Sequence, residues 1–174
     1  MRVLVAYGTT EGQTQKIAEA ITLQVGGLGH EVELFNTTGL QGDLHPEMFD
    51  KIIVAASVHE RRHQESVGVF VAANRETLKA KPTMFVSVSL AAAFERGMAD
   101  AQGYADAFFD DLSWRPSQIL LVAGAVRHGA YGYYKEHILE HVVLQGRELD
   151  DRESDHEFTD WTFLAGAIAD FVAV

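Results

Sequence analysis

The sequence predicts an α/β domain built on a doubly wound parallel sheet, and two observations lead to this fold class. Five short apolar runs, rich in β-branched residues, recur along the 174 residues, and four of them are nearly continuous in apolar residues. This is the pattern of parallel strands covered by helices on both faces. Helical segments alternate with these runs, so each crossover between strands should be right-handed. The predicted strands are 3–6, 32–35, 52–56, 84–88 and 119–123.

The first predicted helix, 13–28, follows from the spacing of its apolar residues. Ile17, Ile21 and Val25 lie four residues apart and so share one helix face. The segment closes with three glycines at 26, 27 and 29, which suit a left-handed C-cap. The next strand alternates Glu with apolar residues over 31–35, which indicates an edge strand with one wetter side. Further helices are predicted at 64–79, 98–112 and 160–173.

One long segment interrupts the alternation, between the fifth strand and the last helix. It runs from residue 127 to 157, whereas a plain connection needs only about 2–6 residues. We therefore predict an insertion at 127–157, with a helix of its own at 133–144. The chain has no linker-like or repeated segment. The sequence thus predicts a single domain over 1–174.

Composition excludes several kinds of function. The chain has no Cys, which rules out disulfides, Cys-ligated zinc, iron–sulfur clusters and thiol catalysis. Its formal net charge of −11 argues against nucleic acid as a partner. The apolar run at 3–6 is too short for a secretory signal, and the longest one, 119–126, is too short to span a bilayer. We therefore expect a cytoplasmic protein.

The loop between the first strand and the first helix carries the clearest chemical signal. Thr9, Thr10 and Thr14 can each donate an O–H where the N–H groups and the dipole of a helix N-terminus converge. Such a cradle can hold a phosphate monoester without Lys or Arg. Neither a Walker loop nor a dinucleotide fingerprint is present. The alternative is that the threonines only cap the helix, but the position at the end of a parallel strand favours phosphate binding.

Residues 9–14 resemble the T-x-x-G-x-T phosphate loop of flavodoxins, which binds the phosphate of FMN. Other segments are similar to one branch of that superfamily, the menaquinone-dependent, flavodoxin-like protoporphyrinogen oxidases of bacteria. The loop specifies only the superfamily, whereas the W-R-P, A-G-A-x-R and T-D-W segments specify the branch, which also carries a long insertion before the last helix. The similar segments are 50–57, 87–90, 114–116, 123–127 and 158–161.

The resemblance implies a flavodoxin-like sheet of strand order 2-1-3-4-5, with FMN over the carboxyl ends of strands one, three and four. It also implies that FAD binds poorly, since the family loop closes around a terminal monoester. The flavin-flanking loops would follow the third and fourth strands. The cofactor-binding residues carried over are Thr9, Thr10, Glu11, Gly12, Gln13, Thr14, Ser57, Val58, His59, Ser89, Leu90 and Ala91.

Few cations are available near this site. A positive group near flavin N1 would stabilise the anionic reduced flavin, and His59, Arg61, Arg62 and His63 follow the third strand. A solvated loop is the alternative, which we favour for Arg61; whether His59 or Arg62 reaches the flavin stays open. Arg127 could pair with a propionate of a porphyrinogen, or with acidic residues of the insertion. The candidate catalytic residues are therefore His59, Arg62 and Arg127.

No metal is expected. His137 and His141 lie four apart in the insertion, but the sequence supplies no evident third ligand. Trp114 and Trp161 are interpreted as packing residues of the core and of a helix start rather than as stacking partners.

Three functions stay open on the sequence. The first is an FMN-dependent oxidoreductase of the protoporphyrinogen oxidase type, with a quinone as electron acceptor. The second is a soluble flavodoxin-like carrier that passes electrons between redox proteins, for which an acidic surface suits docking to a basic reductase. The third is a binding or regulatory domain that has lost its cofactor, against which the intact threonine loop argues. The acidic insertion also predicts weak membrane contact at most, and the sequence allows a homo-oligomer.

Overall fold

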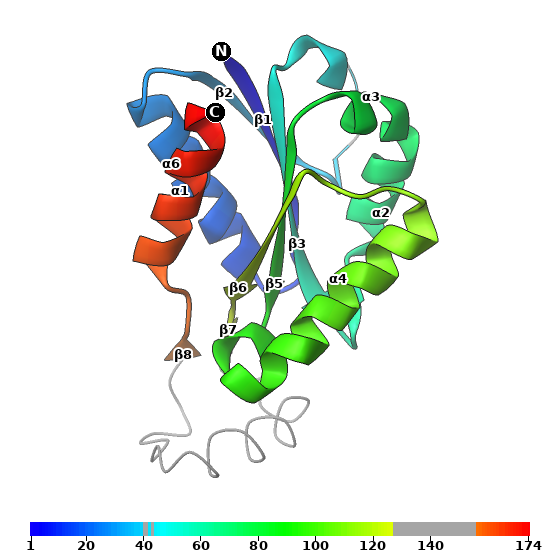
Figure 1. Ribbon diagram of the computed structural model, residues 1–174, viewed down its shortest axis with the longest axis vertical. Helices are drawn as coiled ribbons and strands as arrows, with labels where there is room; N and C mark the ends of the chain where they lie inside the picture. The colour runs from blue at the N-terminus through cyan, green and yellow to red at the C-terminus, as the bar shows by residue number, and fades with distance from the viewer. Residues whose placement is uncertain (40–41, 43, 127–155) are drawn as a thin grey trace.

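The computed structural model describes residues 1–39, 42, 44–126 and 156–174, and the predicted sheet is confirmed within them. Five parallel strands lie in the order β2-β1-β3-β5-β6 (Figure 1). Because β5 and β6 are the fourth and fifth predicted strands, the order 2-1-3-4-5 is confirmed as well. The strands are β1 (Arg2–Gly8), β2 (Glu31–Asn36), β3 (Lys51–His59), β5 (Thr83–Ser89) and β6 (Gln118–Ala123).

Helices cover both faces of the sheet, which explains why the strands consist of apolar runs. α1 (Gln13–Gly27) and α6 (Trp161–Ala173) lie on one face, while α2 (Glu65–Ala73), α3 (Arg75–Ala80) and α4 (Met98–Leu112) lie on the other (Figure 1). Successive strand residues point to opposite faces. In β1, Val3 and Val5 therefore join the core under α1 and α6, and Leu4 and Ala6 join the core under α2 and α4.

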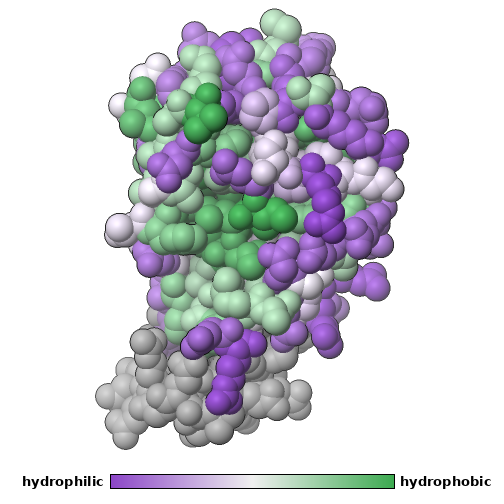
Figure 2. Space-filling model, viewed as in Figure 1, coloured by the Kyte–Doolittle hydropathy of each residue, from purple (hydrophilic) through white to green (hydrophobic). Residues whose placement is uncertain are grey.

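The two edges of the sheet differ. The alternating strand β2 is an edge strand with mostly exposed residues, as predicted. The other edge is β6, where Ile119 and Leu121 are half-buried. Figure 2 shows apolar atoms gathered on this side of the molecule, between α6 and α4. The strand β6 is therefore less completely covered than the three central strands.

Helix ends follow their capping residues. At the end of α1 the predicted left-handed position is Gly29, whose φ is 84°. Its N–H donates to the Gly26 carbonyl at 3.0 Å and the N–H of His30 donates to the Val25 carbonyl at 3.3 Å, the pair of bonds that defines a Schellman motif. At the start of α6, Asp160 Oδ1 accepts the N–H of Phe163 at 2.9 Å, a normal N-cap.

The helix predicted at 64–79 is two helices, α2 and α3, separated at Asn74. The Asn74 side chain donates to the Phe70 carbonyl at 2.8 Å and its backbone N–H donates to the same carbonyl at 3.1 Å. Asn side chains compete in this way with helical backbone bonds, so the first helix ends there. Among the described residues, short 3-10 turns complete the connections: η1 (Pro46–Met48), η2 (Ala91–Ala93) and η3 (Glu95–Gly97).

The segment after β3 is a hairpin rather than a loop that leads directly into a helix. β4 (Arg62–His63) pairs antiparallel with the end of β3, His59 opposite Arg62. The two turn residues, Glu60 and Arg61, have φ of 49° and 65°. Positive φ at both central positions is what a two-residue type I′ hairpin requires. The turn lacks the Asn-Gly pair that usually indicates such a hairpin in a sequence.

The two ends of the predicted insertion meet in a small antiparallel ribbon, which we call the root of the insertion. β7 (Ala125–Val126) pairs antiparallel with β8 (His156–Glu157), so Val126 faces His156 and Ala125 faces Glu157. The last two residues of the predicted 127–157 insertion therefore belong to this ribbon. The predicted helix at 133–144, the His137 and His141 pair and Arg127 lie outside the described residues.

The packing interpretation of the tryptophans is confirmed. Trp114 is 2% exposed and its ring lies edge-on to those of Phe85 and Phe109, at 6.1 and 5.7 Å between centroids. Trp161 opens α6 and packs against the core under α1 and α6. Within the described parts of the chain, no helix combines the length and apolarity needed to cross a membrane.

Candidate cofactor site

A pocket opens at the carboxyl ends of β1, β3 and β5, the edge at which open parallel sheets bind their ligands. It is an open pocket that encloses about 410 Å³ of space, the solvent in its mouth included. The loop after β1 forms one wall, and the ends of β3, β5 and β6 form the rest. The lining residues are Thr9, Thr10, Glu11, Gln13, Thr14, Ser57, Val58, His59, Val88, Ser89, Leu90, Gly124 and Ala125.

Two glycines shape the loop between β1 and α1. A Cβ on Gly8 would lie 2.6 Å from Val67 Cγ2, so only glycine lets the loop leave β1 this close to α2. Gly12, the N-cap of α1, has a φ of 91° and provides no side-chain cap, a conformation that glycine adopts without strain. The N-terminus of α1 thus faces the pocket without a capping side chain, and the helix dipole favours an anion there.

The three predicted threonines present donors to this site. Thr9 Oγ1 accepts the N–H of Gly12 at 2.9 Å, and Thr10 Oγ1 accepts from the side-chain amide of Gln64. A hydroxyl whose oxygen already accepts a bond still has its proton to donate. Thr14 Oγ1 is completely buried, lines the pocket and has no hydrogen-bond partner in the described structure. Because buried hydroxyls are normally satisfied, this group fits a bound acceptor such as a phosphate oxygen.

Gln64 is a site residue that the sequence analysis missed. Its Nε2 donates to Thr10 in the loop and to Ser57 Oγ, at 3.0 Å, at the end of β3. One amide therefore joins two walls of the pocket. Since Gln64 lies 54 residues from Thr10, no local sequence pattern connects them.

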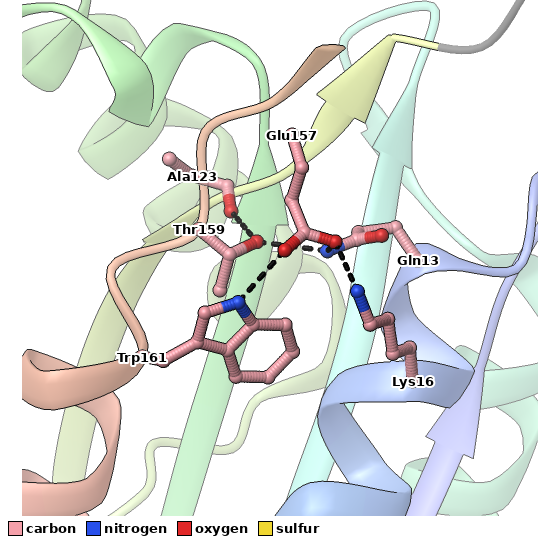
Figure 3. Close-up of polar contacts among 6 residues, drawn as sticks. All are labelled: Gln13, Lys16, Ala123, Glu157, Thr159 and Trp161. Atoms are coloured by element: carbon pink, nitrogen blue, oxygen red, sulfur yellow. Dashed lines mark hydrogen bonds and ion pairs between the residues drawn. The ribbon is translucent and has the colours of Figure 1, made fainter. Parts of the chain in front are cut away.

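The cation nearest the loop in sequence, Lys16, is engaged elsewhere. Its ammonium pairs with the Glu157 carboxylate and lies 5.1 Å from the centroid of the Trp161 ring (Figure 3). Gln13, a predicted cofactor residue, also turns its side-chain amide to this cluster: it donates to Glu157 at 3.1 Å and to Thr159 at 2.9 Å. The loop therefore offers hydroxyls and backbone N–H groups rather than a positive side chain.

Most of the predicted cofactor residues line the pocket. The exceptions are Gly12, which shapes the loop, and Ala91, which begins η2 just beyond Leu90. The prediction missed Val88, Gly124 and Ala125, which complete the wall at the ends of β5 and β6. The A-G-A segment at 123–125 was noted only as a family signature, although its place directly after the fifth strand could have identified it.

The predicted cationic candidates are placed differently from one another. His59 is half-buried and lines the pocket, whereas Arg61 and Arg62 are exposed in the hairpin and outside the lining. Arg127 lies outside the described residues. Of the two catalytic candidates that the structure describes, His59 lines the pocket and Arg62 does not.

His63 is buried and neutral, so it does not supply the positive group near the flavin for which the sequence offered His59, Arg61, Arg62 and His63. It is 8% exposed, its Nε2 lies 2.8 Å from Ser87 Oγ, and the rings of Phe85 and Phe108 pack against it. Burial lowers the pKa of His63 to about 4, with a smaller opposing effect of the Tyr104 backbone. Its imidazole is therefore uncharged at neutral pH.

We expect acidification to destabilise the fold through His63. In the unfolded chain the pKa is about 6.5, so between pH 6.5 and 4 only the unfolded state binds this proton, and stability falls as pH falls. The contribution is about 2 kcal/mol between pH 7.5 and pH 5. Urea unfolding at the two pH values should show this loss in the wild type and a smaller one in His63→Gln. His45→Gln, at an exposed histidine, is the control; an unchanged pH dependence in His63→Gln would contradict the assignment.

Comparison with known proteins agrees with the fold. A family model described as a flavodoxin domain matches residues 4–153. The flavodoxin of Pseudomonas aeruginosa matches the fold with a TM-score of 0.56 over 99% of both chains, at 14% identity. The chain therefore belongs to the flavodoxin family.

Two curated relatives carry a more particular name. A protoporphyrinogen IX dehydrogenase (quinone) of Escherichia coli is 27% identical over 167 residues, which is 95% of this chain and 91% of that protein. A protein of the same name from Leishmania major is 24% identical over 99% of this chain and 75% of its own length. Family and relatives together place this chain among the flavodoxin-like oxidoreductases.

Proposed function

We propose that this protein is an FMN-dependent oxidoreductase that oxidises protoporphyrinogen, or a related reduced substrate, and passes the electrons to a quinone. The observation that carries the proposal is the threonine loop at the N-terminus of α1, together with the buried Thr14 hydroxyl in the first turn of that helix, which has no partner in the described structure. The names of the two curated relatives support the choice of substrate and acceptor.

The residues of the loop fit the phosphate of FMN. Thr9, Thr10 and Thr14 would donate O–H groups to its oxygens, together with first-turn N–H groups of α1. These donors suit a terminal phosphate monoester, which has three free oxygens to accept. FAD carries a bridging pyrophosphate instead, so we expect it to bind poorly.

The remaining walls suit the ring system of a flavin. Val58, Leu90 and Ala125 provide apolar surface, and the backbone that follows β3 and β5 provides hydrogen-bonding groups. When bound, FMN supplies the two-electron redox chemistry. His59 is a basic side chain of the lining, and a positive charge beside the ring would favour its reduced, anionic form.

A soluble electron carrier is the second candidate function. The formal net charge of −11 favours this alternative, because an acidic surface assists docking to a basic reductase. The same charge makes strong attraction to anionic lipid unfavourable. We propose a cytoplasmic site of action in either case.

The proposal is tested first on the purified protein. We expect a yellow protein that releases FMN on denaturation, one per chain, and an apoprotein that rebinds FMN but not FAD. A colourless protein that takes up no flavin would overturn the proposal. Reductive titration then separates the two functions: a single two-electron step favours the dehydrogenase, whereas two one-electron steps favour the carrier.

A further inference from the structure

The carboxylate of Glu157, at the root of the insertion, receives donors from two helices. Its Oε2 accepts from Gln13 Nε2 at 3.1 Å and from Lys16 Nζ, both in the first turns of α1 (Figure 3). Its Oε1 accepts from Trp161 Nε1 at 2.7 Å, in the first turn of α6. The Lys16 hydrogen bond is the main cause that lowers the pKa of Glu157, so the carboxylate is charged at neutral pH. Charge-assisted hydrogen bonds of this kind are the stronger ones.

A buried chain of hydrogen bonds continues this contact into the sheet. Gln13 Nε2 donates to Thr159 Oγ1 at 2.9 Å, and Thr159 Oγ1 donates to the Ala123 carbonyl at 2.7 Å (Figure 3). Gln13 and Thr159 are 7% and 9% exposed. The first residue of α1 is thus tied to the last residue of β6, two elements that meet at the pocket.

The root of the insertion also packs against the loop after β5. Val126 and Phe94 are buried together, and Phe158 lies against Phe94 with 5.7 Å between ring centroids. Ala125, which lines the pocket, pairs with Glu157 in the β7–β8 ribbon. The ribbon therefore contacts the elements on both sides of the pocket, through a carboxylate on one side and an apolar contact on the other.

We infer that Glu157 is a positioning residue for the FMN pocket: it fixes the first turn of α1, and with it the threonine loop, against the β7–β8 ribbon, whose Ala125 lines the pocket. This inference rests on the proposed binding of FMN. It makes the root of the insertion a structural part of the cofactor site, separate from the segment that follows Val126. Glu157 is not among the residues that line the pocket, so its effect passes through its contacts with Gln13, Lys16 and Ala125.

Two substitutions test the contact from opposite sides. Glu157→Gln keeps the size of the side chain but removes its charge, and Lys16→Met removes the ammonium but keeps an apolar chain beside Trp161. We expect the FMN Kd to rise about tenfold in the first and about fivefold in the second, as for moderately coupled sites. The double variant should bind FMN about as weakly as Glu157→Gln alone, because both remove one interaction.

The decisive comparison is between FMN affinity and the stability of the apoprotein. FMN titrations followed by flavin fluorescence give Kd, and urea unfolding of each apoprotein gives stability. Arg115→Met is the matched control, because it removes an exposed arginine paired with Asp106 and Asp110 on α4, and it should leave the Kd unchanged. Lys16 has a side chain 55% exposed, so its variant should fold even if Glu157→Gln does not.

The outcomes are distinguishable. Variants that unfold at lower urea yet bind FMN within about twofold of the wild type would show a merely structural contact and overturn the inference. A wild-type apoprotein that binds no FMN would overturn the proposed function and this inference with it. A raised Kd in both single variants, without additivity in the double variant and without change in Arg115→Met, is the result we expect.

Discussion

Replacing Thr10 and Thr14 together by Ala should weaken FMN binding by about a hundredfold to ten-thousandfold. Each substitution removes a hydroxyl donor to a charged phosphate, worth about 1.5–3 kcal/mol, and the two losses convert to that range of Kd. Thr14 carries the larger share in our account, because its hydroxyl is fully buried and has no partner in the described structure. Titration of the apoprotein with FMN measures the change.

The matched control is Thr22→Ala, further along the same helix. Its hydroxyl donates to the Ala18 carbonyl at 2.8 Å and lies outside the pocket, so its loss should leave the FMN Kd unchanged. Equal FMN affinity in the double variant and the wild type would show that the loop does not hold the phosphate. In that case the threonines only shape the start of α1.

Excising residues 127–155 should abolish most of the substrate oxidation while FMN binding survives. Val126 and His156 face each other in an antiparallel pair, so a two-residue Asn-Gly turn can join them. The shortened chain keeps Glu157, Thr159 and the whole pocket lining. We expect kcat/KM for protoporphyrinogen to fall about a hundredfold or more. A fall of that size corresponds to about 3 kcal/mol of lost transition-state binding.

Artificial electron donors provide the control for this excision. They need no substrate surface, so quinone reduction with them should proceed at a similar rate in both proteins. The prediction assigns the excised segment to substrate or partner choice, and the β7–β8 root to the cofactor site. A folded variant that loses FMN outright would contradict this division. Unchanged oxidation of protoporphyrinogen would contradict the role in substrate choice.

Local patterns predicted most of the fold. Buried parallel strands are continuous apolar runs, and helix 13–28 shows its face and its C-cap glycines in the sequence, so the parallel sheet and most helices follow from them. The order of the strands came instead from the resemblance to flavodoxins. The predictions that were wrong concern features set by single residues, which the hydrophobic pattern does not reveal. Asn74 ends a helix with its own side chain, and Glu60 and Arg61 form a hairpin turn without a glycine.

The sequence predicted the part of the pocket that is built from consecutive residues, but not the contacts between residues that are far apart in sequence. Residues 9–14 predict a phosphate-binding loop because strand, glycine and hydroxyls are adjacent, and most of these residues line the pocket. Gln64 and Glu157 contact the loop region across 54 and 144 residues of sequence. No local sequence motif spans such distances, so the sequence did not indicate these contacts. The charge of His63 was misjudged for a related reason: its pKa is set by the aromatic rings packed around it in the fold.

Anaerobic mixing of the FMN-loaded protein with protoporphyrinogen shows whether this flavodoxin-like chain oxidises a porphyrinogen through FMN. We expect the visible flavin absorbance to bleach and a quinone then to restore it, with porphyrin formed in proportion. A flavin that stays oxidised with protoporphyrinogen, yet is reduced readily by a flavodoxin reductase, would contradict the claim and establish the electron carrier instead.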